Sequence, residues 1–455
     1  MLTDLSFIAD GRVWPPEDAD EKARLEEHAF MRQVYNGLHE KIFPRYIAYL
    51  ADSSKDSKKQ KIILDWPELA TDSYLNLLLG EEPEIEAGTR DDLPDLPTDQ
   101  VFIDVSRYGI GLYEVSDTGI QPLNPENCYI IVTPGNIQVP QAFVFFNVWK
   151  DKESKKEIEY IKFTIHLPGK IQHLIFEISQ GTGLANSEKK LSGPIPLADF
   201  PAYVGLEVDA QGFQYPEVED ILVVWVNNKL SSERYYGRSD YKPSILSLIE
   251  SLELSFAQRD EVLAKFTAPT PVVPESATTF DHATREWVYK AGQAIITKPG
   301  DPSPSLMVWQ AELASVERAI EQKMDQLLQM LQLSRVLLAG QGQGTAESGT
   351  ALRIRLIPTL AKVSKYARAA ETAIPKVLHL WSQLHPPEIP IENITINLQD
   401  GIPDDPRETT QTCALAVAGG FMSVEKAVST CQGLALDSPE LAEEVARIRA
   451  NPSIL

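Results

Sequence analysis

The chain has 455 residues, which is too long for one small hydrophobic core and predicts about two to four structural units. Hydrophobic residues make up 43% and charged residues 24%, as in ordinary folded proteins, but the formal net charge is −23. Free nucleic acid and anionic membranes would repel such a chain, which argues against a protein that clamps DNA tightly.

The cysteine count and the hydropathy pattern restrict the protein further. Cys128, Cys413 and Cys431 are isolated, and no CxxC motif occurs. This sparse, odd number favours a reducing compartment over a disulfide scaffold. No apolar run of about 18 residues is present, so we expect no transmembrane helix, and the first residues carry no signal-peptide pattern.

The first half of the chain predicts helices followed by strands. Apolar residues at helical spacing predict one helix over 17–50, and a second helix ends at Gly80. Residues 83–100 are rich in proline and acids and predict an exposed excursion. From 101 to 226 the pattern predicts strands, and an antiparallel meander is expected at 141–149, 157–166 and 170–179, with a further buried strand at 222–226.

The second half of the chain is mainly helical. Helices are predicted at 243–266 and 310–333, separated by a strand-rich insert at 270–309. The longest predicted helix, 348–384, has an apolar stripe at helical spacing that includes Leu356, Val363 and Val377. It contains Pro358 and Pro375, so we expect it to be kinked. A strand at 391–401 precedes a helical tail in which Ser423 and Ser438 have the positions of N-caps.

Two of these helices carry opposite charges. Glu317, Glu321 and Asp325 form an acidic ladder at i, i+4 spacing, and like charges at this spacing destabilise an isolated helix. Residues 350–380 contain six arginines and lysines against one acid, the most basic element of an acidic chain. This contrast predicts that something basic compensates the ladder.

The glycine-rich stretch at 340–344 does not have the pattern of a phosphate-binding loop. A P-loop requires a lysine after its last glycine, and a dinucleotide fingerprint requires a third glycine and a preceding strand. Gly344 is followed by Thr345, Ala346 and Glu347, and the preceding residues end a helical stripe. A mobile loop is therefore expected, and no nucleotide cofactor.

Patterns for catalysis are also missing. The seven histidines never pair at i, i+3 or i, i+4, so no metal site is expected, and no GxSxG motif occurs. His379 is expected to be packed or solvated. The adjacent acids could in principle bind Mg²⁺, but solvated turns are the favoured interpretation, so we do not expect an enzyme. These acids are Asp91 with Asp92, Asp404 with Asp405, and Glu443 with Glu444.

The order of elements resembles that of tailed-bacteriophage portal proteins, in the family typified by the portals of Bacillus phages. Three segments carry the resemblance: GRSDYKPSILSLIESLELSFAQRDEVLAKFTAPTPVV, ESGTALRIRLIPTLAKVSKYARAAE and INLQDGIPDDPRETTQTCALAVAGGFMSVEKAV. Each motif is loose, but their order extends over about residues 20–450. The first 100 residues match least.

The resemblance implies an α+β portal fold with a defined division of the chain. Residues 1–242 and the long helix with its strand, 348–399, would form the wing. Residues 243–266 and 310–333 would be the stem helices, 267–309 the clip, 334–347 the tunnel loop and 400–455 the crown. Such proteins form a ring of about twelve subunits at one capsid vertex, through which double-stranded DNA enters and leaves.

The resemblance also implies partners and site residues. The partners would be the terminase large subunit, the head–tail adaptor, and the major capsid and scaffolding proteins, in the virion and, during assembly, in the host cytoplasm, with no membrane. Arg335 has an alternative interpretation as a solvated helix-end cation, and the clip aromatics as that element's own core. Residues expected to face DNA are Arg335, Gly340, Gln341, Gly342, Gln343, Gly344 and Thr345. Residues expected at subunit contacts are Glu317, Glu321, Asp325, Arg353, Arg355, Lys362 and Lys365. Residues expected to contact the motor or adaptor are Trp287, Tyr289 and Trp309.

Two alternative functions stay open from the sequence. Acidic residues could act as ligands in a metal-dependent enzyme that processes nucleic acid. Another head–tail ring component is also conceivable, although such chains are usually much shorter. The size of the assembly would discriminate between these hypotheses.

Overall fold

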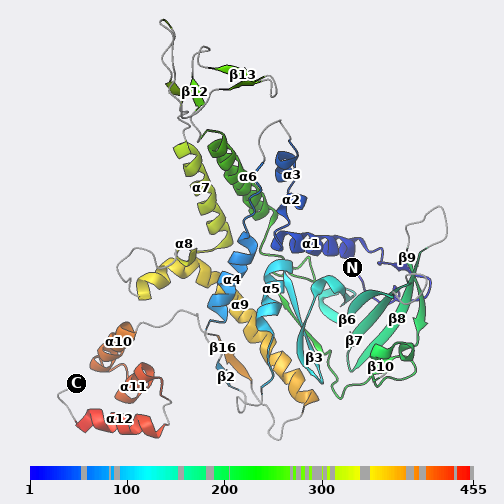
Figure 1. Cartoon of the computed structure of the whole chain (residues 1–455). Coiled ribbons are helices and arrows are strands. Elements are labelled where there is room, and N and C mark those ends of the chain that lie inside the picture. The colour runs from blue at the N-terminus through cyan, green and yellow to red at the C-terminus, as the bar shows by residue number, and fades with distance from the viewer. Residues whose placement is uncertain are drawn as a thin grey trace. The chain divides into compact units, whose positions relative to one another are not determined.

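The chain divides into two compact units in a computed structural model (Figure 1). The first unit comprises Met1–Met31, Pro67–Asp240 and Leu331–Leu455, and the second comprises Arg32–Trp66 and Tyr241–Met330. The structure describes the chain except for residues 53–58, 81–83, 87–92, 152–157, 181–188, 204, 267–269, 273–277, 282–285, 289–299, 301–304, 308–312, 339–348, 386–393, 399–405, 435–437 and 451–455.

The amino-terminal helical region is broken into three helices, so the prediction of one helix over 17–50 was wrong. The helices are α1 (Ala19–Tyr35), α2 (His39–Ile42) and α3 (Pro44–Ala51). Gly37, with φ +67°, ends α1: its N–H donates to Val34 O, and the Leu38 N–H donates to Gln33 O. This pair of bonds is a Schellman motif, which needs a left-handed residue and stops the helix.

Two helices precede the run of strands that begins at Ile110. Helix α4 (Trp66–Leu78) agrees with the prediction, but α5 (Thr98–Tyr108) occupies the start of the region predicted as strands. In α5 the buried positions include Val101, Phe102, Val105 and Tyr108, which is helical rather than alternating spacing. Gly109, with φ +86°, ends the helix and leads directly into a strand.

An antiparallel sheet of seven strands forms the largest part of the first unit, and the predicted meander is confirmed. Its order is β1-β9-β8-β7-β6-β5, and β10 pairs with β8. The strands are β1 (Val13–Trp14), β5 (Cys128–Thr133), β6 (Asn136–Asp151), β7 (Ile158–Leu167), β8 (Lys170–Gln180), β9 (Lys189–Ile195) and β10 (Phe213–Gln214).

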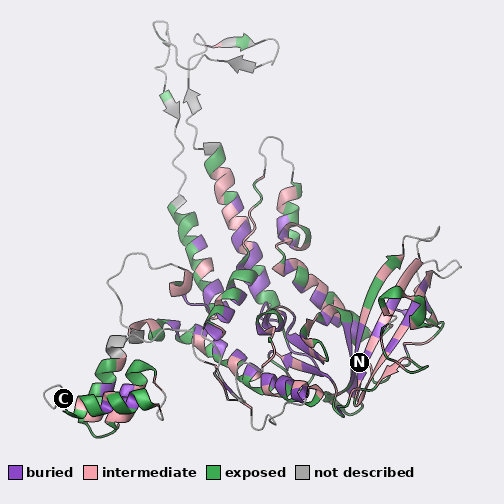
Figure 2. Ribbon diagram, turned by 60° about the horizontal axis from the view of Figure 1, so that its bottom comes forward, coloured by how far each residue is buried: buried purple, intermediate pink, exposed green. Residues whose placement is uncertain are grey.

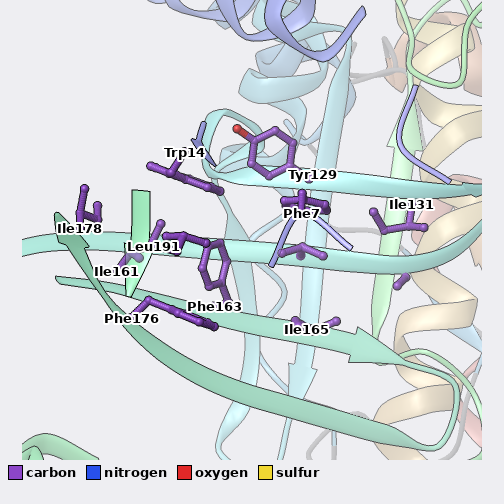
Figure 3. Close-up of a cluster of buried hydrophobic side chains, with 12 residues drawn as sticks. Phe7, Trp14, Tyr129, Ile131, Ile161, Phe163, Ile165, Phe176, Ile178 and Leu191 are labelled. Atoms are coloured by element: carbon purple, nitrogen blue, oxygen red, sulfur yellow. The ribbon is translucent and has the colours of Figure 1, made fainter. Parts of the chain in front are cut away.

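Aromatic side chains pack against this sheet (Figure 3). The rings of Trp14 and Phe163 meet edge to face at 5.1 Å, and those of Phe7 and Tyr129 at 5.5 Å. Phe7 and Trp14, the last residue of β1, come from the first residues of the chain, whereas Tyr129 and Phe163 come from β5 and β7. The amino-terminal segment is therefore part of this core, since edge-to-face pairs add stability to the burial itself.

A second sheet of the first unit supports the longest helix. Its order is β11 (Val223–Asn227), β3 (Ile110–Ser116) and β4 (Gly119–Leu123). Helix α9 (Gly349–Leu384) packs on β11 and β3 and buries the predicted stripe at positions such as Leu356, Val363 and Val377. The predicted strand at 222–226 is thus confirmed as β11. Both Pro358 and Pro375 lie inside α9; the kink they imply stays a prediction.

The second unit contains two long helices and short strands. Helix α6 (Pro243–Phe266) buries Ile245, Ile249 and Leu252, whereas Leu263 is exposed. Helix α7 (Leu313–Leu331) follows the strand-rich insert, as predicted. Between them, β12 (Thr270–Val272) pairs with β15 (Ser305–Met307), and β13 (Thr279–Asp281) pairs with β14 (Glu286–Val288).

The carboxy-terminal region contains three helices, in which buried residues are interspersed with exposed ones (Figure 2). A small core of Val428, Leu441 and Val445 lies between the last two of these helices. The Ser423 and Ser438 hydroxyls accept from the N–H groups of Lys426 and Leu441, as N-cap side chains do. The helices are α10 (Pro406–Ala418), α11 (Val424–Gln432) and α12 (Pro439–Ala450); before them come α8 (Arg335–Leu338) and β16 (Thr395–Asn397), which pairs with β2 (Glu84–Glu86).

Candidate functional site

The acidic ladder lies on the solvent side of α7. Glu317, Glu321 and Asp325 are exposed, whereas Ile320 and Leu327 on the same helix are buried. The apolar side of α7 is therefore buried at Ile320 and Leu327, although Val316 is 39% exposed, and the three carboxylates lie at the surface. Such a face attracts a basic surface and repels nucleic acid.

Three of the four α9 residues that we predicted at subunit contacts are exposed. Arg353, Arg355 and Lys365 lie at the surface. Lys362 differs, because its side chain is only 2% exposed and its ammonium forms an ion pair with Asp240 of the first unit. We therefore no longer expect Lys362 at a subunit contact.

Lys362 belongs to a buried cluster of polar groups around Asp240. Asp240 Oδ1 lies 2.5 Å from Lys362 Nζ and 2.5 Å from Lys229 Nζ, and it accepts from the Asn228 amide at 3.0 Å. The Ser106 hydroxyl donates to Oδ2 at 3.2 Å, and the Tyr366 hydroxyl also donates to Oδ2. The Asp240 side chain is 4% exposed, so one carboxylate gathers donors from α5, α9 and the residues after β11.

Burial and charge determine the ionisation of this cluster. Burial opposes the ionised form of Asp240, but the ammonium groups of Lys362 and Lys229 outweigh it and hold the Asp240 pKa well below its ordinary value. Burial lowers the pKa of Lys362 to about 8, against the attraction of Asp240. Two cations therefore share one buried anion, and the ionised forms of all three groups hold the surrounding segments together.

The remaining predicted site residues are only partly described. Arg335 begins α8 and is exposed. The glycine-loop residues Gly340, Gln341, Gly342, Gln343, Gly344 and Thr345 lie outside the described residues, as do Tyr289 and Trp309. The backbone of Trp287 forms part of β14, but its side chain is not described.

The described residues contain no group of three or more histidine, cysteine, aspartate and glutamate residues that could hold a metal ion. No helix in the described ranges is both long and apolar enough to cross a membrane. His379 is exposed on α9, and its Nε2 lies 3.0 Å from the Gln383 amide.

Sequence reasoning did not find the Asp240 cluster. Asp240 and Lys362 are 122 positions apart, and Asp240 lies in the first of the three segments that carry the resemblance, where nothing points to a buried partner. One feature of the sequence could have indicated a buried ion pair, namely a lysine on the apolar side of the long helix. Lys362 directly precedes Val363, a member of the buried stripe, and a cation at such a position needs a buried partner.

The fold and the charged helical faces together indicate a class of protein. The chain is an acidic α+β protein with an exposed acidic face on α7 and exposed basic residues on α9, and faces of opposite charge suit assembly with other chains. The whole stretch 16–451 matches the family described as phage portal protein, SPP1 Gp6-like.

The chain therefore belongs to the phage portal protein family. No individually curated protein matches it. Portal proteins are ring-forming structural proteins, and as a member of this family the chain is a component of the virion at a capsid vertex.

Proposed function

We propose that this chain forms a closed ring of about twelve copies through which double-stranded DNA is packaged and ejected. In this proposal the ring is the docking site for the terminase large subunit and the head–tail adaptor. It contacts major capsid and scaffolding proteins during assembly in the host cytoplasm. The observation that carries the proposal is the family match over 16–451, nearly the whole chain.

The exposed helical faces support ring formation. The acidic ladder of α7 and the basic residues Arg353 and Arg355 of α9 are complementary, and a contact between different surfaces of identical copies closes into a ring when the rotation fits. Next to these arginines, Ile354 is 62% exposed and Ile357 is 58% exposed. Large apolar side chains at such exposure suit burial against a neighbouring copy.

In this proposal each part of the portal is formed by the residue range expected from the resemblance. The two units do not follow that division, because the second unit combines 32–66 with the proposed stem helices and clip. Wing, stem, clip, tunnel loop and crown are therefore proposed for the residue ranges given above. The clip residues Trp287, Tyr289 and Trp309 are proposed contacts of the motor or adaptor.

The acidic charge supports a conduit that does not hold DNA. Each retained phosphate contact would strengthen DNA binding and slow movement of the DNA, so a net charge of −23 suits DNA transit.

Arg335 is the proposed phosphate contact beside the glycine loop. We expect Arg335→Ala to change the salt dependence of packaging in a packaging assay. Equal packaging by the variant and the native protein at both low and high salt would remove this role.

Imaging of the purified full chain tests the ring directly. We expect electron microscopy to show rings with a central channel. Native mass spectrometry should give an assembly on the order of 0.6 MDa, from about twelve chains of 50.7 kDa. A monodisperse monomer with metal-dependent activity on nucleic acid would contradict the portal function.

A further inference from the structure

Two of the three cysteines lie beside each other in the carboxy-terminal region. Cys413 belongs to α10 and Cys431 to α11, and these two helices pack on each other (Figure 1). Their side chains interact directly, since burial and a hydrogen bond with the Cys431 thiol raise the pKa of Cys413. Both cysteines are free, so the pair is in its reduced form.

The packing of α10 directs Cys413 toward α11. Cys413 is 5% exposed, and it is the one buried residue among the α10 side chains that the structure describes, 409–418. Helix α10 packs on α11, so the buried side of α10 is the side that faces α11. The Cys413 thiol therefore lies in the contact between the two helices.

Cys431 lies on the side of α11 that faces α10. It follows Ala427 by four positions, and residues at this spacing share one face of a helix. Ala427 is buried but lies outside the small core between α11 and α12. The face that Ala427 and Cys431 share is therefore the one directed at α10.

The connection between the two helices brings the cysteines to similar heights. Residues 419–423 join α10 to α11, and a connection of this length makes an antiparallel helical hairpin. Cys413 lies five positions before Ala418, the end of α10, and Cys431 lies seven positions after Val424, the start of α11. At 1.5 Å per residue, these positions are about 8 Å and 10 Å from the turn.

The two thiols differ in their access to solvent. Cys431 is exposed, whereas Cys413 is buried. A small oxidant therefore reaches Cys431 first, and the Cys413 thiol is already in place to react with the oxidised sulfur. An accessible cysteine next to a second, resolving cysteine is the arrangement of redox-sensitive pairs.

We propose that Cys413 and Cys431 form a reversible disulfide that locks the α10–α11 hairpin under oxidising conditions, with hydrogen peroxide as the oxidant. The Cys431 thiolate attacks one peroxide oxygen, the O–O bond breaks, and the leaving hydroxide takes up the proton of the former thiol. The Cys413 sulfur then attacks the Cys431 sulfenic acid, the S–O bond breaks, and the hydroxyl leaves as water with the Cys413 proton. The two sulfurs lose two electrons, and one peroxide becomes two waters.

The place of the chain in the virion suits such a lock. Thiols stay reduced in the cytoplasm, whereas disulfides form and persist at virion surfaces. The chain is a virion component, so it meets both conditions. The hairpin would be unlinked in the cytoplasm and linked in the released particle. This chemistry does not depend on ring formation or on DNA passage, so it can fail while the proposed function holds.

Peptide mapping of the full chain tests whether the bond forms. The reduced chain is treated with hydrogen peroxide and digested without reductant. We expect the peptides that contain Cys413 and Cys431 to be linked, in material that runs as a single chain on a denaturing gel, and dithiothreitol to separate them. Cys128, which is buried in β5, should stay a thiol and serves as the internal control. A disulfide between two copies would overturn the proposal, as would oxidation of Cys431 to a sulfinic acid while Cys413 stays a thiol.

Hydrogen exchange tests whether the bond locks the hairpin. We expect oxidation to slow exchange at the Ala427 and Val428 amides at least about tenfold, because the cross-link restricts opening of α11. Cys431→Ser, at an exposed position, should fold normally and show no slowing. Thr430→Ser, a matched change at the exposed neighbouring residue, keeps both thiols and should behave like the native chain. Equal slowing in Cys431→Ser, or no slowing in the native chain once the bond has formed, would overturn the lock.

Discussion

At the scale of single residues, buried charge was the property that sequence reasoning could least foresee. The partners of Asp240 come from positions 106, 228, 229, 362 and 366, and only folding brings them together. Helical spacing correctly predicted the stripe around Val363, because that signal is local. It gave no partner for Lys362, because a charge pair between distant segments leaves no periodic pattern.

Removing the Asp240 charge should strongly destabilise the first unit. We expect Asp240→Asn to lower the free energy of unfolding by about 3–5 kcal/mol, since it leaves the buried Lys362 ammonium without its counter-charge. Chemical denaturation would measure the change, with Asp72→Asn at an exposed position of α4 as the control. Adding Lys362→Met to Asp240→Asn should recover part of the loss. No recovery would show that the cation is not its cause.

A second buried pair predicts how the stability of the second unit depends on pH. His39 Nδ1 lies 2.5 Å from Glu253 Oε1, and its Nε2 lies 2.9 Å from Val34 O. Both ring nitrogens face acceptors, so the protonated imidazole satisfies both. Burial lowers the His39 pKa, but the bond to Glu253 outweighs it and raises the pKa above 6.5.

Because the folded-state pKa of His39 is raised, its stabilising contribution is complete below pH 6.5 and is lost as the pH rises through the folded value. We expect the free energy of unfolding to fall over that window, and His39→Gln to flatten the dependence. Denaturation curves at a series of pH values measure it. An equally steep dependence in His39→Gln would assign the titration to another group.

At the scale of elements, a helix or strand was predicted correctly where a local sequence pattern determines its structure. The meander and α9 were predicted correctly because their periods extend over many residues. The helix at 17–50 was predicted as continuous because its apolar spacing hid Gly37, whose left-handed conformation ends α1. Helix α5 was missed because its β-branched and aromatic residues favour strands by composition, whereas its burial period is helical.

Capping gives a prediction for one element. The Ser423 hydroxyl accepts from the Lys426 N–H at 3.2 Å at the start of α11. We expect Ser423→Ala to cost about 1 kcal/mol and to speed hydrogen exchange at the Lys426 amide. Ser423→Asn retains an acceptor and should behave like the native chain. Unchanged exchange in Ser423→Ala would show that the hydroxyl does not stabilise this end of the helix.

At the scale of the whole molecule, the acidic face of α7 and the basic face of α9 give the proposed ring its chemistry. Both faces are exposed in the single chain, so their contribution to assembly depends on contact between copies. An exposed ion pair is worth only about 0.2–1 kcal/mol. A ring repeats each pair at every interface, so small terms add up, and the assembly becomes sensitive to salt.

Charge reversal tests whether these two faces meet. We expect replacement of Glu317, Glu321 and Asp325 by lysine to weaken each interface about tenfold or more, because attraction becomes repulsion. Adding Arg353→Glu and Arg355→Glu should restore assembly, since the charges are then exchanged rather than lost. Sedimentation velocity at low salt measures the fraction in rings, and high salt should reduce the difference between variants. Normal assembly of the lysine variant at low salt would show that the faces do not meet, as would an exchanged variant that assembles no better than the lysine variant.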